Sequence, residues 1–425
     1  MNRFFVLTVF LVFLVAGCQD DDHIATPLTP TSTTETAQGP ATVVATSLAP
    51  ASPTPINPFE LNTVTPTAVP PTATPTATPT NTPRPTPVAV VEVAGASLPP
   101  GFSFVKFADF VRPTSLTADA DGRIYATSQD GSIGVFEDVD GDGRADVDHL
   151  FSSGFYIPLG ITIRPGTNDV WVSSNSKISI LRDTDSDFVA DEAVNFVNGL
   201  PVGLHQNDNL KFGPDGMLYM GVGSTCDACA EADSRSATIM RFDPETGEGK
   251  VFATGMRNPY DLAFHPFTGD LLATDNGRDG LGMDAPGEEL NHIVQGGDYG
   301  FPDCWDDGQG PGCDGTSTAI AFFEPHASAD SLDFYTGDKF PPPYLPEGTA
   351  VSLFVGVFGS WLKPEAETGI AHVRLTPDGD SYQTEVAWLA QWPGGMPLGL
   401  IVGTDGALYV GDYINDAIYR ISYWP

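Results

Sequence analysis

The residues from Asp138 to Asp146 have the types and the spacing of a calcium-binding loop. Carboxylates stand at positions 1, 3, 5 and 9 of this stretch, as Asp138, Asp140, Asp142 and Asp146, and a glycine stands at position 6. Ca²⁺ takes several oxygen ligands at once, and a glycine at the sixth position allows the sharp turn that brings them together. We expect Ca²⁺ here, although no glutamate occupies position 12. The alternative is an acidic turn whose aspartates bond to their own backbone.

A second acidic loop repeats this spacing further along the chain. Its aspartates are Asp183, Asp185, Asp187 and Asp191, but Phe188 replaces the glycine of the first loop. Both loops directly follow a stretch that alternates like a β-strand. The pattern leaves open whether this second loop binds Ca²⁺ or is an acidic turn.

The first 18 residues resemble the signal peptide of a bacterial lipoprotein. Arg3 precedes an apolar run at 4–16 that is short for a membrane span, and small residues lead directly into Cys18. The resemblance implies that Cys18 becomes the lipidated first residue of the mature chain. We therefore expect an exported, extracytoplasmic protein anchored to the cell membrane by lipid. Ordinary signal cleavage beside an incidental cysteine is the alternative.

Residues 19–95 predict a disordered tether rich in Thr and Pro. Proline fixes φ and removes a backbone donor, so this stretch favours extended chain, and it has few large apolar side chains to offset the entropy of ordering. The whole chain has 19 Lys+Arg against 55 Asp+Glu, a formal net charge of -36. That charge argues against nucleic acid and anionic lipid headgroups as partners. Membrane contact is expected through the lipid anchor alone.

Four further cysteines form two close pairs. Cys226 and Cys229 enclose two residues, and Cys304 and Cys313 bracket an acidic, glycine-rich loop. An even number of cysteines in an exported chain predicts two disulfides, 226–229 and 304–313. A redox pair and a zinc site with four cysteines are the alternatives, and the oxidising compartment favours the disulfides.

The remainder of the chain, residues 96–425, repeats one unit of short strand, Gly/Asp/Pro turn and second short strand. A third strand often follows, and no convincing amphipathic helix occurs. Repeats of roughly 40 to 60 residues built from short strands predict an all-β fold, a six-bladed β-propeller. A pair of β-sandwiches is the alternative. Five copies begin near Pro113, Pro158, Asp208, Pro259 and Pro397, and a degenerate sixth lies around 349–356 and 371–375.

Several short blocks occur in the order in which one enzyme family carries them. HQNDNLKFGPDG begins at His205, GMRNP occupies 255–259, GEELN occupies 287–291 and GGDYGFP occupies 296–302. Together they resemble the blocks of the soluble quinoprotein glucose/sorbosone dehydrogenases. The sorbosone dehydrogenase branch is the most similar, because ATDNGRDGLG stands intact at 273–282. The resemblance extends over about 98–423.

The resemblance implies a six-bladed propeller that holds pyrroloquinoline quinone (PQQ) and Ca²⁺ over its central axis. Such proteins oxidise aldoses or sorbosone-type sugars. In that picture His205 is the base that takes the proton of the substrate hydroxyl while hydride goes to the quinone. Arg257 and Asn258 hold the quinone oxygens, and Arg257 stabilises the charge that develops on the reduced cofactor.

Calcium ligands also carry over from the resemblance. Glu289 and the backbone of Tyr299 match positions that bind calcium in relatives. Gly277 and Arg278 fall where backbone carbonyls coordinate the calcium of the cofactor in part of the family. The resemblance therefore places metal ligands in the segment 277–299.

Ser360 and Trp361 match a further cofactor-contact block, but the chain departs from the family beside it. Leu362 and Lys363 replace an Asn-Arg pair, and Lys363 is expected to supply the cation. Met396 stands where relatives carry an arginine, and the first blade lacks a glutamine that some relatives use. Loss of a charge that pairs with the tricarboxylate cofactor costs on the order of 2 kcal/mol.

Two functions from different classes follow from these patterns. The first is a PQQ- and Ca²⁺-dependent sugar dehydrogenase at the cell surface, with an electron acceptor that the sequence does not identify. The second is a non-catalytic propeller that binds glycan or protein partners. His205, Arg257, Asn258 and the block from Glu289 to Pro302 favour the first function. Met396 and Leu398 favour the second.

Overall fold

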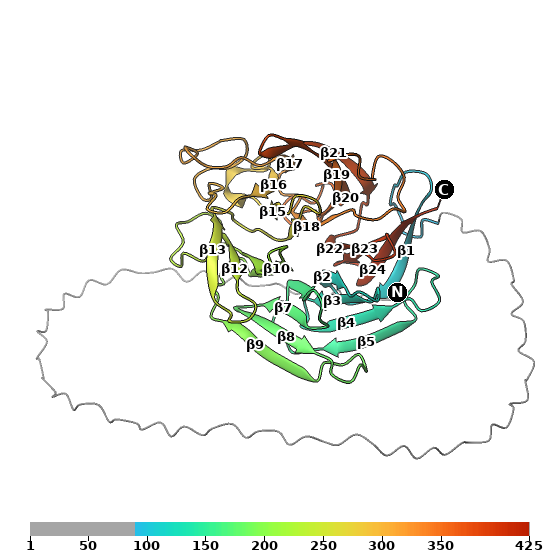
Figure 1. Cartoon of the computed structure of the whole chain (residues 1–425). Helices are drawn as coiled ribbons and strands as arrows, with labels where there is room; N and C mark the ends of the chain where they lie inside the picture. The colour runs from blue at the N-terminus through green and yellow to red at the C-terminus, as the bar shows by residue number, and fades with distance from the viewer. Residues whose placement is uncertain (1–89, 425) are drawn as a thin grey trace, which may run out of the picture. The chain divides into compact units, whose positions relative to one another are not determined.

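The computed structural model describes residues 90–424 of the chain. Six antiparallel sheets of four strands each are arranged around a central axis (Figure 1). Their innermost strands β2, β6, β10, β14, β18 and β22 contact one another in a closed ring. The all-β, six-bladed propeller predicted from the repeats is confirmed, including the degenerate sixth unit, which forms the sheet of β18 to β21.

Blades 1 to 3 follow one another along the chain, each with its innermost strand first. Their strands are β2 (Pro113–Ala118), β3 (Ile124–Ser128), β4 (Ile133–Glu137) and β5 (Val147–Ser152); β6 (Gly160–Ile163), β7 (Val170–Ser174), β8 (Lys177–Arg182) and β9 (Glu192–Asn198); β10 (Asn207–Phe212), β11 (Leu218–Val222), β12 (Thr238–Phe242) and β13 (Gly249–Thr254).

Blades 4 to 6 continue the same order, and β1 (Phe102–Asp109) completes blade 6 by pairing with its last strand. The short 3₁₀ helix η1 (Asp279–Leu281) is inserted in blade 4. The strands are β14 (Leu262–Phe264), β15 (Leu271–Asp275), β16 (Glu288–Ile293) and β17 (Ala321–Phe323); β18 (Ala329–Phe334), β19 (Val351–Val357), β20 (Gly369–Asp378) and β21 (Ser381–Gln391); β22 (Pro397–Val402), β23 (Leu408–Asp412) and β24 (Ala417–Tyr423).

The core lies between the blades. The second strand of every blade is buried along its whole length, whereas the fourth strands of blades 1 to 3 are largely exposed. The inner strands therefore hold the apolar side chains that pack blade against blade. Among the described residues, no helix has the length and apolarity needed to cross a membrane.

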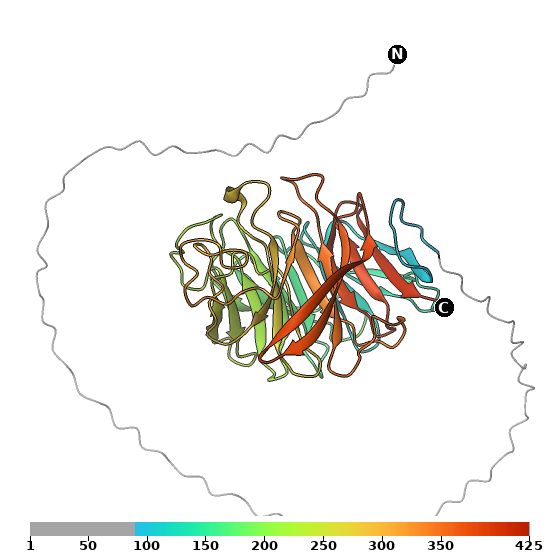
Figure 2. The same ribbon diagram turned by 90° about the horizontal axis from the view of Figure 1, so that it is seen from above.

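The two ends of the propeller carry different connections (Figure 2). Because the strands of each blade are antiparallel, one end carries the turns from first to second and from third to fourth strand. We call this the lower end. The other, upper end carries the loops from second to third strand and from each blade to the next. Loops from several blades meet at the upper end and give it the residues for a site.

The predicted signal peptide with Cys18, and the tether up to residue 89, lie outside the described residues. Residues 90–95, which the sequence assigned to the tether, pack against the propeller. The Phe104 amide donates to Val90 O at 2.8 Å, and the Glu92 amide donates to Phe104 O at 2.9 Å. Val93 is buried. These six residues therefore belong to the folded part.

Candidate active site

A cavity of about 210 Å³ opens at the upper end, between blades 3, 4 and 5. Loops from all three blades supply its lining, so residues far apart in sequence meet there. Six residues predicted from sequence are among them: His205, Arg257, Asn258, Gly277, Ser360 and Trp361. Six others were not predicted: Asn276, Asp279, Glu288, His326, Ser328 and Leu362.

His205 precedes β10 and is fixed by a hydrogen-bond chain. Its Nδ1 lies 2.9 Å from the Ser224 hydroxyl, which donates to the carbonyl of Cys226 at 2.7 Å. Because that hydroxyl proton is committed to the carbonyl, Nδ1 carries the imidazole proton and Nε2 is the free acceptor. Burial and the charge of Arg257 lower the pKa of His205 to about 3. The ring is therefore neutral at physiological pH.

Gly223 allows this close approach of the histidine to β11. A Cβ at that position would lie 2.4 Å from the Cβ of His205. Any larger residue would push the imidazole out of place, so the backbone itself helps to set the position of the ring.

Arg257 is buried, and its guanidinium bonds to the protein on every side. Nε donates to the Asp227 carbonyl at 3.1 Å and one terminal nitrogen to the Asn276 carbonyl at 3.1 Å. The other terminal nitrogen contacts carboxylate oxygens of Asp227 at 2.9 Å and Asp279 at 3.1 Å. The guanidinium is thus rigidly placed, and two carboxylates already offset its charge.

The disulfide between Cys226 and Cys229 lies at this junction. Asp227, which holds Arg257, stands inside its four-residue ring, and the Cys226 carbonyl ends the chain that fixes His205. The Asp279 amide also donates to Asp227 at 2.7 Å. One small covalent ring therefore positions both groups. A second disulfide joins Cys304 and Cys313.

Oxygen atoms gather on the blade 4 side of the cavity. Glu288 is 3% exposed and accepts hydrogen bonds from the Gly277 amide at 2.7 Å and the Ser328 amide at 3.3 Å. Burial raises the pKa of its carboxyl to about 7. Asn276 donates to Asp330 at 2.6 Å, while its Oδ1 is buried without a partner. A buried acceptor without a donor indicates a missing water or cation.

Two of the predicted calcium residues do not line this cavity. Glu289 pairs across the sheet with Asp275, so its side chain lies on the other face of β16 from that of Glu288. Burial and the charge of Asp275 raise the pKa of Glu289 to about 8. Tyr299 is buried, and its hydroxyl donates to the His292 carbonyl at 2.5 Å.

Arg278, predicted to bind calcium through its backbone carbonyl, and Lys363, predicted as the substitute cation, also lie outside the cavity lining. Arg278 donates to the Pro302 carbonyl at 3.1 Å and lies over the Trp305 ring, 5.4 Å from its centroid. Lys363 forms an ion pair with Glu324 at 2.7 Å. The expected substitute for the missing arginine is therefore bound to a carboxylate and does not face the cavity.

An apolar cluster occupies the centre of the upper end. Tyr260, Phe358 and Leu398 form it, and Met396 packs against it. The Tyr260 hydroxyl donates to the Thr114 carbonyl at 3.3 Å, which joins blade 4 to the opposite blade 1. The cluster therefore connects opposite blades at the upper end, and Met396 is part of it at the position where relatives carry an arginine.

The two acidic loops lie at the lower end, between the third and fourth strands of blades 1 and 2. Carboxylate oxygens of three aspartates in each loop lie within 4.8 Å of one another. Asp142 is not in the first group; its side chain accepts from the Arg144 amide at 2.9 Å. The neighbouring carboxylates raise the pKa of Asp185. The groups are Asp138, Asp140 and Asp146, and Asp183, Asp185 and Asp191.

Sequence reasoning missed Glu288 because it selected the neighbouring Glu289. The two residues alternate on one strand, so only one of them can face a given side. Asp279 and His326 stand in loops without a repeat. The signal for Asp279 was its position two residues after Gly277, within the block already selected.

Comparisons with known proteins agree with the fold. A family model described as a domain of unknown function (DUF7133) matches residues 97–292. An uncharacterized protein from Borreliella burgdorferi is 26% identical over 208 residues, which are 44% of this chain and 53% of the relative. The match thus spans about half the length of that curated relative.

Solved structures share the propeller over most of its length. The holo form of the pyranose dehydrogenase PQQ domain from Coprinopsis cinerea has a TM-score of 0.66 at 14% identity, covering 79% of this chain and 99% of that one. The calcium structure of a Trichoderma reesei carbohydrate-active enzyme of family AA12 has a TM-score of 0.65 at 16% identity, covering 80% and 99%. These similarities show a common fold.

Proposed function

We propose that this chain is a PQQ- and Ca²⁺-dependent dehydrogenase that oxidises sugars of the aldose or sorbosone type at the cell surface. One observation carries the proposal: His205, Arg257, Asn258, Gly277, Ser360 and Trp361 line one cavity at one end of the propeller. The same fold occurs in structures described as a PQQ domain of a pyranose dehydrogenase and as a calcium-bound AA12 enzyme.

The charges of the cavity decide how the cofactor fits. PQQ carries three carboxylates, whereas Arg257 is already paired with Asp227 and Asp279, and Glu288 adds a further carboxyl. The quinone alone therefore does not suit this lining. A divalent cation offsets two negative charges and suits the oxygens of Glu288, Asp279 and Asn276. The donor set thus fits PQQ together with Ca²⁺, and Arg257 and Asn258 are the residues that would hold the quinone.

The cofactor, when bound, would accept hydride from the substrate carbon. His205 would accept the hydroxyl proton at Nε2, because Ser224 holds the proton at Nδ1. Its low pKa makes it a weak base in the empty cavity, and an anion bound beside Arg257 would strengthen it. Trp361, 66% exposed at the mouth, offers an aromatic face for the sugar.

Reconstitution tests this proposal directly. Purified full-length protein is incubated with PQQ and Ca²⁺, PQQ alone, or Ca²⁺ alone, and dye-linked oxidation of an aldose panel is measured. We expect turnover only with both, because the quinone needs the cation to enter the cavity. Absence of turnover and of PQQ binding by a folded protein would contradict the dehydrogenase function.

A second candidate function is a non-catalytic propeller that binds glycan or protein partners. The specific observation in its favour is that Arg257 and Lys363 are both paired with carboxylates and Met396 packs against an apolar cluster. A folded protein that fails to bind PQQ in the presence of Ca²⁺ would support this function.

The cell-surface location is part of the proposal and rests on the sequence around Cys18. Replacing Cys18 by Ala should release the protein from membranes into the soluble exported fraction. If the Cys18→Ala protein fractionates like wild type, the anchor is refuted. The electron acceptor remains to be identified.

A further inference from the structure

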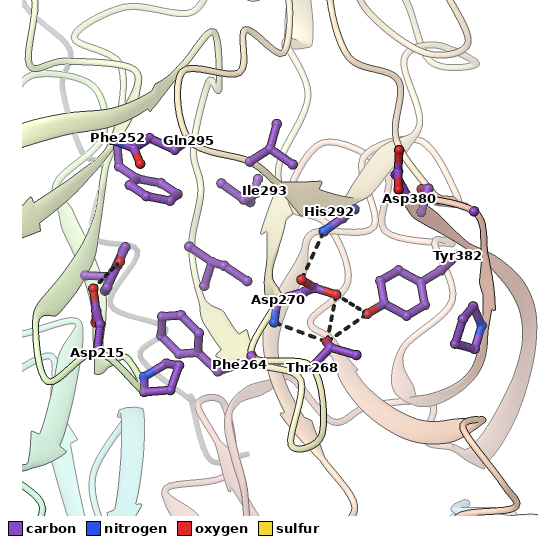
Figure 3. A pocket seen from close by; sticks show the side chains of 18 residues that line it. Asp215, Phe252, Phe264, Thr268, Asp270, His292, Ile293, Gln295, Asp380 and Tyr382 are labelled. Carbon is purple, nitrogen blue, oxygen red and sulfur yellow. Dashed lines mark hydrogen bonds and ion pairs between the residues drawn. The ribbon is translucent and has the colours of Figure 1, made fainter.

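A second cavity, of about 650 Å³, lies at the lower end of the propeller (Figure 3). Its lining comes from the same three blades as the upper cavity but from the opposite connections. Blade 3 contributes its first turn, blade 4 contributes the turn at 268–271 and the segment 292–295, and blade 5 contributes the hairpin tip at 377–382. The two cavities are therefore separate sites.

The hairpin of blade 5 is longer than its counterparts and forms one wall. Strands β20 and β21 have 10 and 11 residues, whereas the third and fourth strands of the other blades have three to eight. The extra length carries Tyr382 to blade 4, where its hydroxyl donates to Asp270. Tyr382 also stacks on His265, with ring centroids 5.4 Å apart. This wall would not exist with a hairpin of ordinary length.

Asp270 is the polar centre of the cavity. Its Oδ2 accepts from Tyr382 and, at 2.7 Å, from the Thr268 hydroxyl. Burial alone would raise its pKa, but these hydrogen bonds outweigh burial and lower it. The carboxylate is thus ionised at neutral pH. Its Oδ1 has no hydrogen-bond donor among the described residues, and His292 Nε2 lies 4.0 Å away.

The part of the cavity on the other face of blade 4, toward blade 3, is aromatic (Figure 3). Phe252 and Phe264 pack edge-on against Tyr219, with ring centroids 5.0 and 5.1 Å apart. Asp215 lies below them, but Arg241 pairs with its carboxylate at 2.6 Å. No lysine or arginine belongs to the lining. An anionic ligand would therefore meet Asp270 without a counter-charge.

We propose that this lower cavity binds a neutral oligosaccharide. A sugar ring presents an apolar face of C–H groups and a rim of hydroxyls. The phenylalanines, with Gln295 beside Phe252, suit the face of one sugar unit. Around the edge of blade 4, Asp270 would accept hydrogen bonds from the hydroxyls of a neighbouring unit, with His292 beside it. The volume is within the range of small-molecule sites. The proposal does not depend on the dehydrogenase function, because the two cavities share no lining residue.

Calorimetric titration tests the proposal on the purified full-length protein. The probes are maltotriose, cellotriose and xylotriose as neutral trisaccharides, the glucosamine trimer as a cation and trigalacturonate as an anion. We expect a neutral trisaccharide to bind and the anion not to bind. Asp270→Asn and Phe252→Ala should each weaken binding about tenfold. Glu385→Gln, an exposed residue of the same hairpin, is the matched control and should bind like wild type.

Three results would overturn the proposal. No heat from any neutral trisaccharide would exclude this ligand class. Binding of the glucosamine trimer alone would identify a cation site instead. Unchanged neutral-sugar binding in both Asp270→Asn and Phe252→Ala would place the sugar elsewhere. Melting temperatures of the variants are measured in parallel, and Tyr382→Phe, which removes one hydroxyl from the network, provides a milder variant if Phe252→Ala unfolds.

Discussion

The upper and lower cavities are built from the same three blades, yet their carboxyl groups behave in opposite ways. At the upper end, burial raises the pKa of Glu288 to about 7. At the lower end, hydrogen bonds from Tyr382 and Thr268 lower the pKa of Asp270. The first carboxyl becomes fully charged most readily when a cation arrives, whereas the second displays its charge to any ligand.

The difference follows from the connections at each end. Long upper loops fold over one another, so Arg257 is buried and bonded on every side. The lower cavity depends on one long hairpin, because strands β20 and β21 supply its wall. The upper end is therefore preorganised for charge and proton chemistry, while the lower end offers an open binding surface. Variants that affect one end and leave the other intact test this distinction.

The largest expected effect is a loss of turnover, and it distinguishes His205 of the upper cavity from His292 of the lower cavity. His205→Ala removes the imidazole proposed to take the substrate proton and should lower turnover of the reconstituted protein about 10²–10⁴-fold. His292→Ala, in the lower cavity, should leave turnover unchanged and weaken trisaccharide binding. Dye-linked kinetics and calorimetry measure the two effects. If His292→Ala abolishes turnover and His205→Ala does not, the reaction takes place in the lower cavity and not in the upper one.

The next effect concerns the ring closed by Cys226 and Cys229. Replacing both cysteines by serine frees Asp227 and the carbonyl that fixes Ser224, so Arg257 and His205 lose their positions. We expect kcat to fall about tenfold or more with a shifted pH–rate profile, since misplaced catalytic groups cost this much. Cys304→Ser with Cys313→Ser is the matched control. Equal losses in both double variants would indicate a general effect on folding.

A smaller effect separates the adjacent glutamates of β16. Glu288→Gln should raise the Ca²⁺ concentration that protects the protein against heat by about tenfold, because one charged ligand is lost. Glu289→Gln should leave this concentration unchanged, since its side chain lies on the other face of the strand. Thermal melts across a calcium titration give both numbers. If Glu289→Gln raised this concentration and Glu288→Gln did not, Glu289, the residue predicted from sequence, would be the calcium ligand.

The smallest effect is on the pH dependence of stability without calcium. The folded-state pKa values of Glu288 and Asp275, both raised to about 7 by burial, exceed their ordinary values near 4. Between those values the folded chain holds more protons than the unfolded chain, so the free energy of unfolding falls as pH rises through this window. Urea midpoints in chelator should be lower at pH 8 than at pH 5. Glu288→Gln should reduce this difference, and a rising midpoint would contradict these pKa shifts.

The fold could be predicted because its signal is local and repeated. The sequence of each blade contains its own alternating strands and its own turn. Even the degenerate unit at 349–375 could therefore be predicted as a blade from its position between clearer units. The site was predictable where a motif and a loop coincide, as at His205 and Arg257. Lys363 was not, because its partner Glu324 stands in a different loop, 39 positions earlier in the printed sequence. Glu288 required knowledge of which face of β16 meets the cavity.

The pairing of β1 with β24 has a consequence for the synthesis of the protein. Phe102 pairs with Tyr423, so β1, the first of the described strands, meets its partner only when the last described strand has been synthesised. Until then β1 presents an unpaired edge, and the bulge between Lys106 and Ala108 makes that edge a poor template for other chains. Every blade must therefore be present before the ring can close, and a chain that stops before β24 leaves β1 without its partner strand.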